Sequence, residues 1–209
     1  MLSPARKQPS DTHPSTLVGV RWVESVDASK KQQNKDGEVL ATALLQKHRG
    51  VPVEQPGKVT MYAFRHPLDA LEWCFDCQTA LNKQAKDDGE AADRLAMFVH
   101  MGVSEGPTLF SNRHKQLQGP AVGWLEEITP LVHGGQVVIS GHTWQEILRQ
   151  GGPAREYSET DLGKHRLHAS HQPCTLLQIM PTGLENRLFP PLSTLPMAKT
   201  NLPVVASQI

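Results

Sequence analysis

Apolar runs of strand length alternate with helix-type patterns along most of this chain, and this alternation constrains the fold more than any other feature. The apolar runs at residues 15–23 and 136–140 are rich in β-branched side chains and have the length of strands. Residues 38–50, 67–84 and 141–150 repeat apolar side chains with helical spacing. A chain of this kind buries its strands in a sheet that is covered by helices.

The remaining segments complete the predicted order of elements. Residues 51–64 read as two strands around a tight turn at Pro56-Gly57, and polar residues 25–37 as a loop leading into the first helix. Strands are also predicted at 94–106 and around 164–169 and 174–180. Residues 106–120 read as a second strand or a turn, and a helix is predicted within 118–140. The pattern predicts an α+β fold with a mixed, mainly antiparallel sheet and helices packed chiefly on one face.

The length of 209 residues suits one domain with short extensions. Residues 1–14 are expected to form a flexible N-terminal arm, and residues 15–180 the folded domain. Residues 181–209 are rich in proline and are expected to form an extended C-terminal tail.

Composition excludes several classes of function. No apolar run approaches the roughly 18 residues that a membrane span needs, and the formal net charge of +0 with no long basic patch argues against nucleic acid as a partner. The odd count of three cysteines favours a reduced intracellular compartment over a disulfide framework. We therefore expect an intracellular protein, cytoplasmic or associated with the cytoskeleton or a cilium. A mitochondrial presequence is less favoured, because Asp11 and the prolines near it oppose an amphipathic helix.

Three blocks of sequence carry a family resemblance. "VHMGVSEG" at 99–106 is similar to a V-R-I-G-I-H-T-G strand. "QGPAVGWLEEITPLVHGGQVVIS" at 118–140 is similar to a Y-x-G-x-x-V-N-x-A-A-R helix followed by G-G-Q-I-L-V-S. "DLGKHRLHASHQPCTLLQIMPTGLENRLFPPLST" at 161–194 resembles a L-G-x-x-x-L-K-G-x-x-x-P-x-x-L-Y-Q-V ending with F-P-P-L after it. In this order, the blocks resemble the catalytic domain of class III adenylyl or guanylyl cyclases over about residues 15–195. The resemblance implies that family's fold, which has a ferredoxin-like core.

The resemblance also implies a demanding chemistry. Two metal ions hold the triphosphate so that the ribose 3'-hydroxyl can attack the α-phosphate, and such ions take hard oxygen ligands from two aspartates. One aspartate lies on the first strand and the other at the turn of the central hairpin. An Asn and an Arg on the later helix orient the ribose and stabilise charge in the transition state. The two sets come from different subunits.

This sequence departs from the family pattern at all four positions. Arg21 aligns with the first aspartate, and Lys58 with the second. Gly123 stands where the family has the Asn, and Glu127 where it has the Arg. A cation about 4 Å from a second cation costs about 4 kcal/mol at an effective dielectric of 20, so these substitutions oppose metal binding. We expect no catalytic residues, no metal and no cofactor in this chain.

The functional prediction follows from these losses. We expect a catalytically inactive cyclase-like domain that associates with protein partners, as a homo-oligomer, a hetero-oligomer or a subunit of a large complex. The second hypothesis is a nucleotide-binding regulator without turnover, with Lys58 or Arg21 on the phosphates and with Glu54 and Gln116 near the purine-selecting positions. The third is an active cyclase that uses an unorthodox carboxylate pair, for instance Glu24 with Glu54.

The cysteines and histidines, which could bind a metal ion or react, have simpler interpretations. Cys74 and Cys77 form a C-x-x-C within a predicted helix, where buried structural thiols are favoured over zinc or redox chemistry. The three histidines at 165, 168 and 171 are evenly spaced, but the first two point to opposite faces of a strand.

The serines and Trp124 also have structural interpretations. Neither Ser104 nor Ser140 lies in an obvious nucleophile turn, and Ser140 or Thr143 is expected to cap the following helix. Trp124 follows the position that should face substrate, and a core role is favoured over partner binding.

Overall fold

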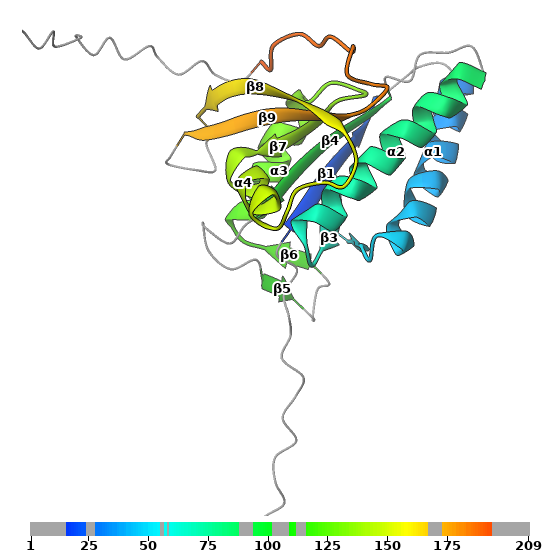
Figure 1. The fold of residues 1–209 in the computed structure, drawn as a ribbon. Coiled ribbons are helices and arrows are strands. Elements are labelled where there is room, and N and C mark those ends of the chain that lie inside the picture. The colour runs from blue at the N-terminus through cyan, green and yellow to red at the C-terminus, as the bar shows by residue number, and fades with distance from the viewer. Residues whose placement is uncertain are drawn as a thin grey trace, which may run out of the picture.

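The computed structural model describes residues 16–23, 28–54, 57, 59–87, 94–101, 109–111, 116–166 and 173–193, and these form a mixed sheet with helices on both faces (Figure 1). The sheet has seven strands in the order β2-β3-β1-β4-β7-β9-β8, and β5 pairs with β6 in a separate two-stranded sheet. Every neighbouring pair is antiparallel except β4 and β7, which are parallel. The prediction of a mixed, mainly antiparallel sheet is confirmed.

The elements follow one another along the chain with short connections. Their bounds are β1 Thr16–Trp22, α1 Ala28–Lys47, β2 Val51–Val53, β3 Thr60–Phe64, α2 Pro67–Asp87, β4 Leu95–Met101, β5 Leu109–Ser111, β6 Gln116–Gln118, α3 Pro120–Ile128, the short 3-10 helix η2 Thr129–Leu131, β7 Val137–Ser140, α4 Gly141–Arg149, β8 Tyr157–His165 and β9 Cys174–Pro181. Among the described residues, no helix combines the length and the apolar character needed to cross a bilayer.

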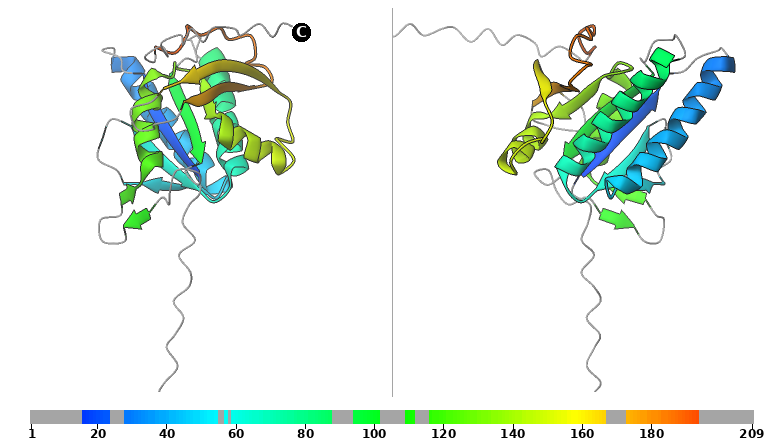
Figure 2. Two further views of the ribbon diagram at one scale, coloured as in Figure 1. Left: turned by 90° about the vertical axis from the view of Figure 1, so that its left-hand side faces the viewer. Right: turned by 45° about the vertical axis from the view of Figure 1, so that its right-hand side comes forward.

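The central strands are buried on both faces. Alternate side chains of β1 and β4, such as Val18 and Val99, pack against α1, α2 and α4. The intervening side chains, such as Leu17 and Phe98, pack against α3. Three helices therefore cover one face and α3 covers part of the other, and this confirms the prediction that helices lie chiefly on one face (Figure 2).

Two elements differ from the sequence prediction in their extent. Helix α1 begins at Ala28, about ten residues before the predicted start, so part of the predicted loop is helical. Tertiary contact explains the difference, because Asn34 Nδ2 donates to the carbonyl of Val23 at 3.0 Å and Gly37 lies against the indole of Trp22. Strand β8 spans Tyr157–His165 rather than residues around 164–169, because its polar sequence lies at the edge of the sheet and carries little apolar signal.

Gly19 of β1 allows α3 and η2 to approach the sheet closely. A Cβ at this position would lie 2.2 Å from Thr129 Oγ1, 3.1 Å from Leu125 Cγ and 3.2 Å from Val59 Cγ1. Real Cβ atoms do not approach other atoms at 2.2 Å, so any larger residue would push η2 off the strand. The lack of a side chain at Gly19 thus sets the depth at which the α3 layer sits.

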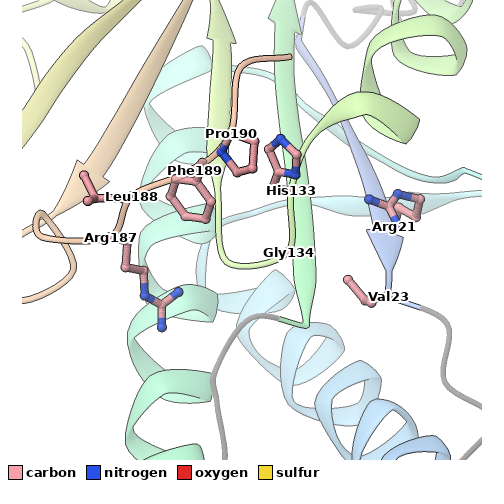
Figure 3. Close-up of a pocket in the computed structure, with 8 residues that line it drawn as sticks. All are labelled: Arg21, Val23, His133, Gly134, Arg187, Leu188, Phe189 and Pro190. Carbon is pink, nitrogen blue, oxygen red and sulfur yellow. The ribbon is translucent and has the colours of Figure 1, made fainter. Parts of the chain in front are cut away.

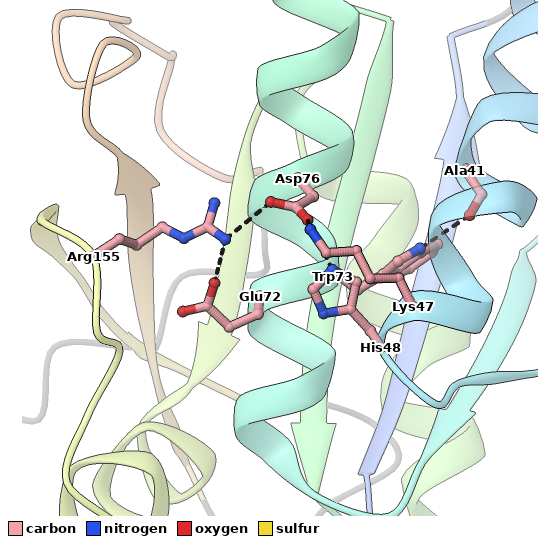
Figure 4. A network of polar contacts seen from close by, with 7 residues as sticks. All are labelled: Ala41, Lys47, His48, Glu72, Trp73, Asp76 and Arg155. Carbon is pink, nitrogen blue, oxygen red and sulfur yellow. Dashed lines mark hydrogen bonds and ion pairs between the residues drawn. The ribbon is translucent and has the colours of Figure 1, made fainter.

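A charged network ties α2 to its neighbours (Figure 4). Asp76 Oδ2 accepts from Lys47 Nζ at 2.7 Å and from His48 Nε2 at 2.8 Å. Asp76 Oδ1 accepts from Arg155 Nη2 at 2.9 Å, and the same guanidinium group contacts Glu72 Oε2 at 2.5 Å. Burial alone would raise the pKa of Asp76, but the hydrogen bonds from Lys47, His48 and Arg155 outweigh it and lower the pKa from 3.8 to about 2. The network joins the end of α1 and the loop before β8 to α2.

We predict that Asp76→Asn lowers the free energy of unfolding at pH 7 by about 2 kcal/mol, since each pKa unit corresponds to about 1.4 kcal/mol. The folded-state pKa is depressed, so this stabilisation is present above about pH 4 and is lost as the pH falls toward 2. Urea titrations from pH 7 to pH 2.5 measure both quantities. Asp69→Asn is the matched control: Asp69 pairs with Arg49, whose side chain is 76% exposed, and should cost less than about 1 kcal/mol. Equal losses in the two variants would contradict the prediction.

We also predict that Gly19→Ala destabilises the fold by about 1–3 kcal/mol through overpacking against Thr129. Thr129→Ala alone should have a small effect, because Thr129 Oγ1 is buried without a hydrogen-bond partner among the described residues. In the double variant the clash is relieved, and more than half of the lost stability should return. Urea unfolding measures the stability of all three variants. If the loss in the double variant equals the sum of the two single losses, the contact between residues 19 and 129 does not limit this packing.

Candidate functional site

The end of β1 and the β2–β3 connection lie side by side. Strand β1 pairs with β3 from Thr16↔Phe64 to Val20↔Thr60, so the residues after Val20 lie beside the connection that precedes β3. Arg21 is opposite Ala96 of β4. The alignment of a first-strand residue and a hairpin turn at one end of the sheet is the arrangement that the cyclase resemblance requires.

Arg21 is half-buried at this end of the sheet and belongs to the α3 face, like Gly19 two residues earlier and Leu17 four residues earlier. Its Nη2 atom donates to the carbonyl of Val132 at 2.7 Å. Val132 directly follows η2, so the guanidinium group holds the segment that leaves α3. A cation thus stands, with a backbone partner, at the position aligned with the first metal-binding aspartate.

Helix α3 begins at Pro120 after Gly119, whose φ of 136° is a conformation that favours glycine. Its buried side packs on the sheet through Ala121, Val122, Trp124, Leu125 and Ile128. Gly123 and Glu127 are both half-buried and four residues apart, so they share a different side of the helix.

The hairpin turn also lies near α3. A Cβ built on Gly57 would be 4.0 Å from Glu126 Oε1, which places this turn beside the helix. The structure therefore brings together three of the elements that the resemblance assigns to the site: the end of β1, the β2–β3 turn and α3. Lys58 lies outside the described residues, as does Glu24. Glu54 is exposed, and Gln116 lies in β6, with its side chain outside the description.

Trp124 is a core residue, as predicted from the sequence. Its side chain is 4% exposed and stacks on His100, with ring centroids 4.4 Å apart and an interplanar angle of 1°. His100 Nδ1 is 2.9 Å from Ser140 Oγ, which is 2.6 Å from Thr143 Oγ1. The indole thus packs on His100 of β4, and the polar chain links β4, β7 and α4.

The capping prediction for α4 is wrong. Ser140 occupies the N-cap position but makes no side-chain capping bond. Thr143 Oγ1 instead accepts from the backbone N–H of Met101 on β4 at 2.8 Å. Both hydroxyls are buried, so Ser140 is also sheltered from any substrate, and Ser104 lies outside the described residues.

The cysteines and histidines do not form a reactive site in the described part of the chain. Cys74 and Cys77 are free and buried in α2, and burial raises the pKa of both thiols, so they remain protonated and unreactive. His165 is buried with Nε2 2.9 Å from the carbonyl of Leu162, while the histidines at 168 and 171 lie outside the described residues.

A two-metal centre does not fit the described residues. Such a centre needs converging carboxylates, and the described residues contain no group of three or more His, Cys, Asp or Glu side chains that could hold an ion. At the end of β1 the side chain is a guanidinium group, which repels cations. The described residues at the end of β1 therefore offer no carboxylate ligand to a metal ion.

A cavity of about 480 Å³ opens next to Arg21 (Figure 3). Its lining comes from three parts of the chain, namely Arg21 and Val23, His133 and Gly134, and the stretch Arg187–Pro190. Sequence reasoning did not single out His133 or Arg187. The F-P-P-L block included Phe189, but nothing in the sequence indicated that this segment would return to the end of β1.

Comparisons with known proteins bear on the fold. No family model matches the sequence, and no curated protein matches it. Solved structures of cyclases do match the fold. An adenylate cyclase structure from Trypanosoma brucei in the monomeric state is 16% identical, covers 90% of this chain and 98% of its own, and has a TM-score of 0.65.

Two further structures give the same result. An adenylate/guanylate cyclase/hydrolase from Silicibacter pomeroyi is 16% identical, with 80% of this chain and 96% of that chain covered and a TM-score of 0.64. The guanylate cyclase domain of RhGC from Catenaria anguillulae, solved in complex with GTP, is 14% identical, with 79% and 95% covered and a TM-score of 0.56. The chain therefore has the fold of the class III adenylyl and guanylyl cyclase catalytic domains, which is the fold that its sequence resemblance predicted.

Proposed function

We propose that this domain keeps the cyclase fold without cyclase turnover and serves as a protein-association or structural subunit of a larger assembly. The observation that carries the proposal is the guanidinium group of Arg21. It stands at the aligned metal position and donates to the carbonyl of Val132 at 2.7 Å. A cation fixed in this way repels a metal ion and also contributes to the packing of the segment after α3.

The state of α3 supports the same proposal. The helix retains its apolar contacts with the sheet through residues such as Leu125 and Ile128. Gly123 has no side chain with which to orient a ribose, and Glu127 carries the wrong charge to stabilise a phosphate transition state. Helix α3 is thus suited to packing rather than to chemistry.

The surface offers sites for protein association. Large apolar side chains are exposed on α1, β2 and the segment after β9, where Val39 is 71%, Val51 55% and Leu188 95% exposed. Strands β2 and β8 are the two edges of the sheet, and edge strands can pair with another chain. We also propose that this assembly lies in the cytoplasm or on the cytoskeleton, for instance in a cilium.

The absence of turnover is tested with the purified chain, ATP or GTP, and magnesium or manganese. We expect no cyclic nucleotide and no metal-dependent heat of nucleotide binding in calorimetry. An active cyclase domain assayed in parallel is the positive control. Enzymes commonly turn over at about 1–1000 per second, so the activity of the control is easily detected. The variant Arg21→Met should be equally inactive.

Two results would change this assignment. Metal-dependent turnover by the wild-type chain would restore the cyclase interpretation. Nucleotide binding that does not depend on metal would favour the alternative of a regulatory module, with Arg21 among the groups available to phosphates.

Association is tested by isolating the tagged full chain from its source cells and reconstituting the complex from purified proteins. We expect a stoichiometric complex that survives gel filtration, and at least one of Val39→Asp, Val51→Asp and Leu188→Asp should weaken it about tenfold or more. Thr79→Asp adds the same charge at an exposed polar site on α2 and is the control. A chain that stays monomeric in extract and when purified would refute the association role.

A further inference from the structure

We propose that the cavity beside Arg21 is a binding site for an organic anion, a flat apolar body that carries carboxylate or phosphate groups. This inference goes beyond the association role and does not depend on it. It rests on the charge, shape and hydrogen-bonding capacity of the cavity lining.

The cavity lining is cationic. Arg21 and Arg187 both line the cavity together with His133, and none of the described lining residues is acidic. Positive side chains in a concave site concentrate the field there and attract anions. The volume of about 480 Å³ falls within the range of small-molecule sites.

The middle of the cavity has an aromatic wall. The rings of His133 and Phe189 stack with centroids 6.2 Å apart and an interplanar angle of 11°. Pro190 continues this wall, with Arg187 to one side of it and Arg21 to the other (Figure 3). A flat body can lie on the wall, and anionic groups at its two ends then point toward the two arginines.

The cationic groups are already oriented. Arg21 is held by the carbonyl of Val132 at 2.7 Å. Arg187 is held by Asn82 Oδ1 at 3.0 Å and by the carbonyl of Gly135 at 3.3 Å. Groups held in this way lose little conformational freedom when a ligand binds.

The cavity lining also has unused hydrogen-bonding capacity. Arg21 Nε and His133 Nε2 are buried atoms with no hydrogen-bond partner among the described residues. Both belong to side chains that line the cavity, and buried polar groups in proteins are normally paired. An anion with oxygen acceptors supplies the partner for Arg21, and for His133 when Nε2 carries a proton.

The test uses three probes of matched shape in calorimetric titrations of the full chain without metal: terephthalate, benzoate and benzamide. We expect terephthalate, which has a carboxylate at each end, to bind about tenfold more tightly than benzoate. Neutral benzamide should not bind detectably. Equal binding of all three probes, or no binding by any anion, would overturn the proposal. Phenyl phosphate and inorganic phosphate, run alongside, distinguish a phosphate ligand from a carboxylate ligand.

Variants locate the binding. His133→Leu places an apolar side chain of similar size against Phe189 and removes the ring nitrogens. It should weaken terephthalate binding several-fold while the fold is retained. Arg21→Gln should weaken binding about tenfold, with the fold checked by circular dichroism. Arg49→Gln removes an exposed cation elsewhere and should leave affinity unchanged. Unchanged affinity in both cavity variants, or an equal loss in Arg49→Gln, would place the anion outside this cavity.

Discussion

The burial of β1 and β4 on both faces is the constraint on which the rest of the structure depends. All residues from Leu95 to Met101 are buried, and so are those from Thr16 to Val20. Strands that are buried on both sides need a cover on each, so three helices are required on one face and α3 on the other. The second cover fits only because Gly19 has no side chain beneath η2. The position of α3, and with it the end of β1, follows from this packing.

Different side chains of α3 pack on the sheet and occupy the positions that the cyclase resemblance assigns to substrate. The side chains that hold the helix on the sheet, such as Leu125, are not the ones that the cyclase resemblance assigns to substrate. Gly123 and Glu127 occupy another side of the same helix and can change with little cost to the core. At the end of β1 the opposite occurs, because Arg21 contributes a hydrogen bond to the fold from a position that the resemblance assigns to a metal ligand.

Much of the fold could be predicted from the sequence, because the apolar strands and α2 carry strong periodic signals. The long first half of α1 could not, since its polar side chains gave no apolar stripe and its stability comes from contacts with Val23 and Trp22. The predicted position of strand β8 was too far along the chain for the same reason, because its sequence is polar. The family motifs located Arg21, Gly123 and Glu127, whereas His133 and Arg187 join the cavity through tertiary folding alone, which no local pattern records.

The course of the segment after β9 also affects when the cavity can exist. Arg21 contacts a residue 111 positions away and Arg187 one 105 positions away, so the cavity is assembled from the first strand, the middle and the end of the described chain. During synthesis it can close only after nearly the whole domain has emerged from the ribosome, and contacts of such long range form late and slowly. A molecule bound there would recognise the completed native state alone and would increase its population by mass action.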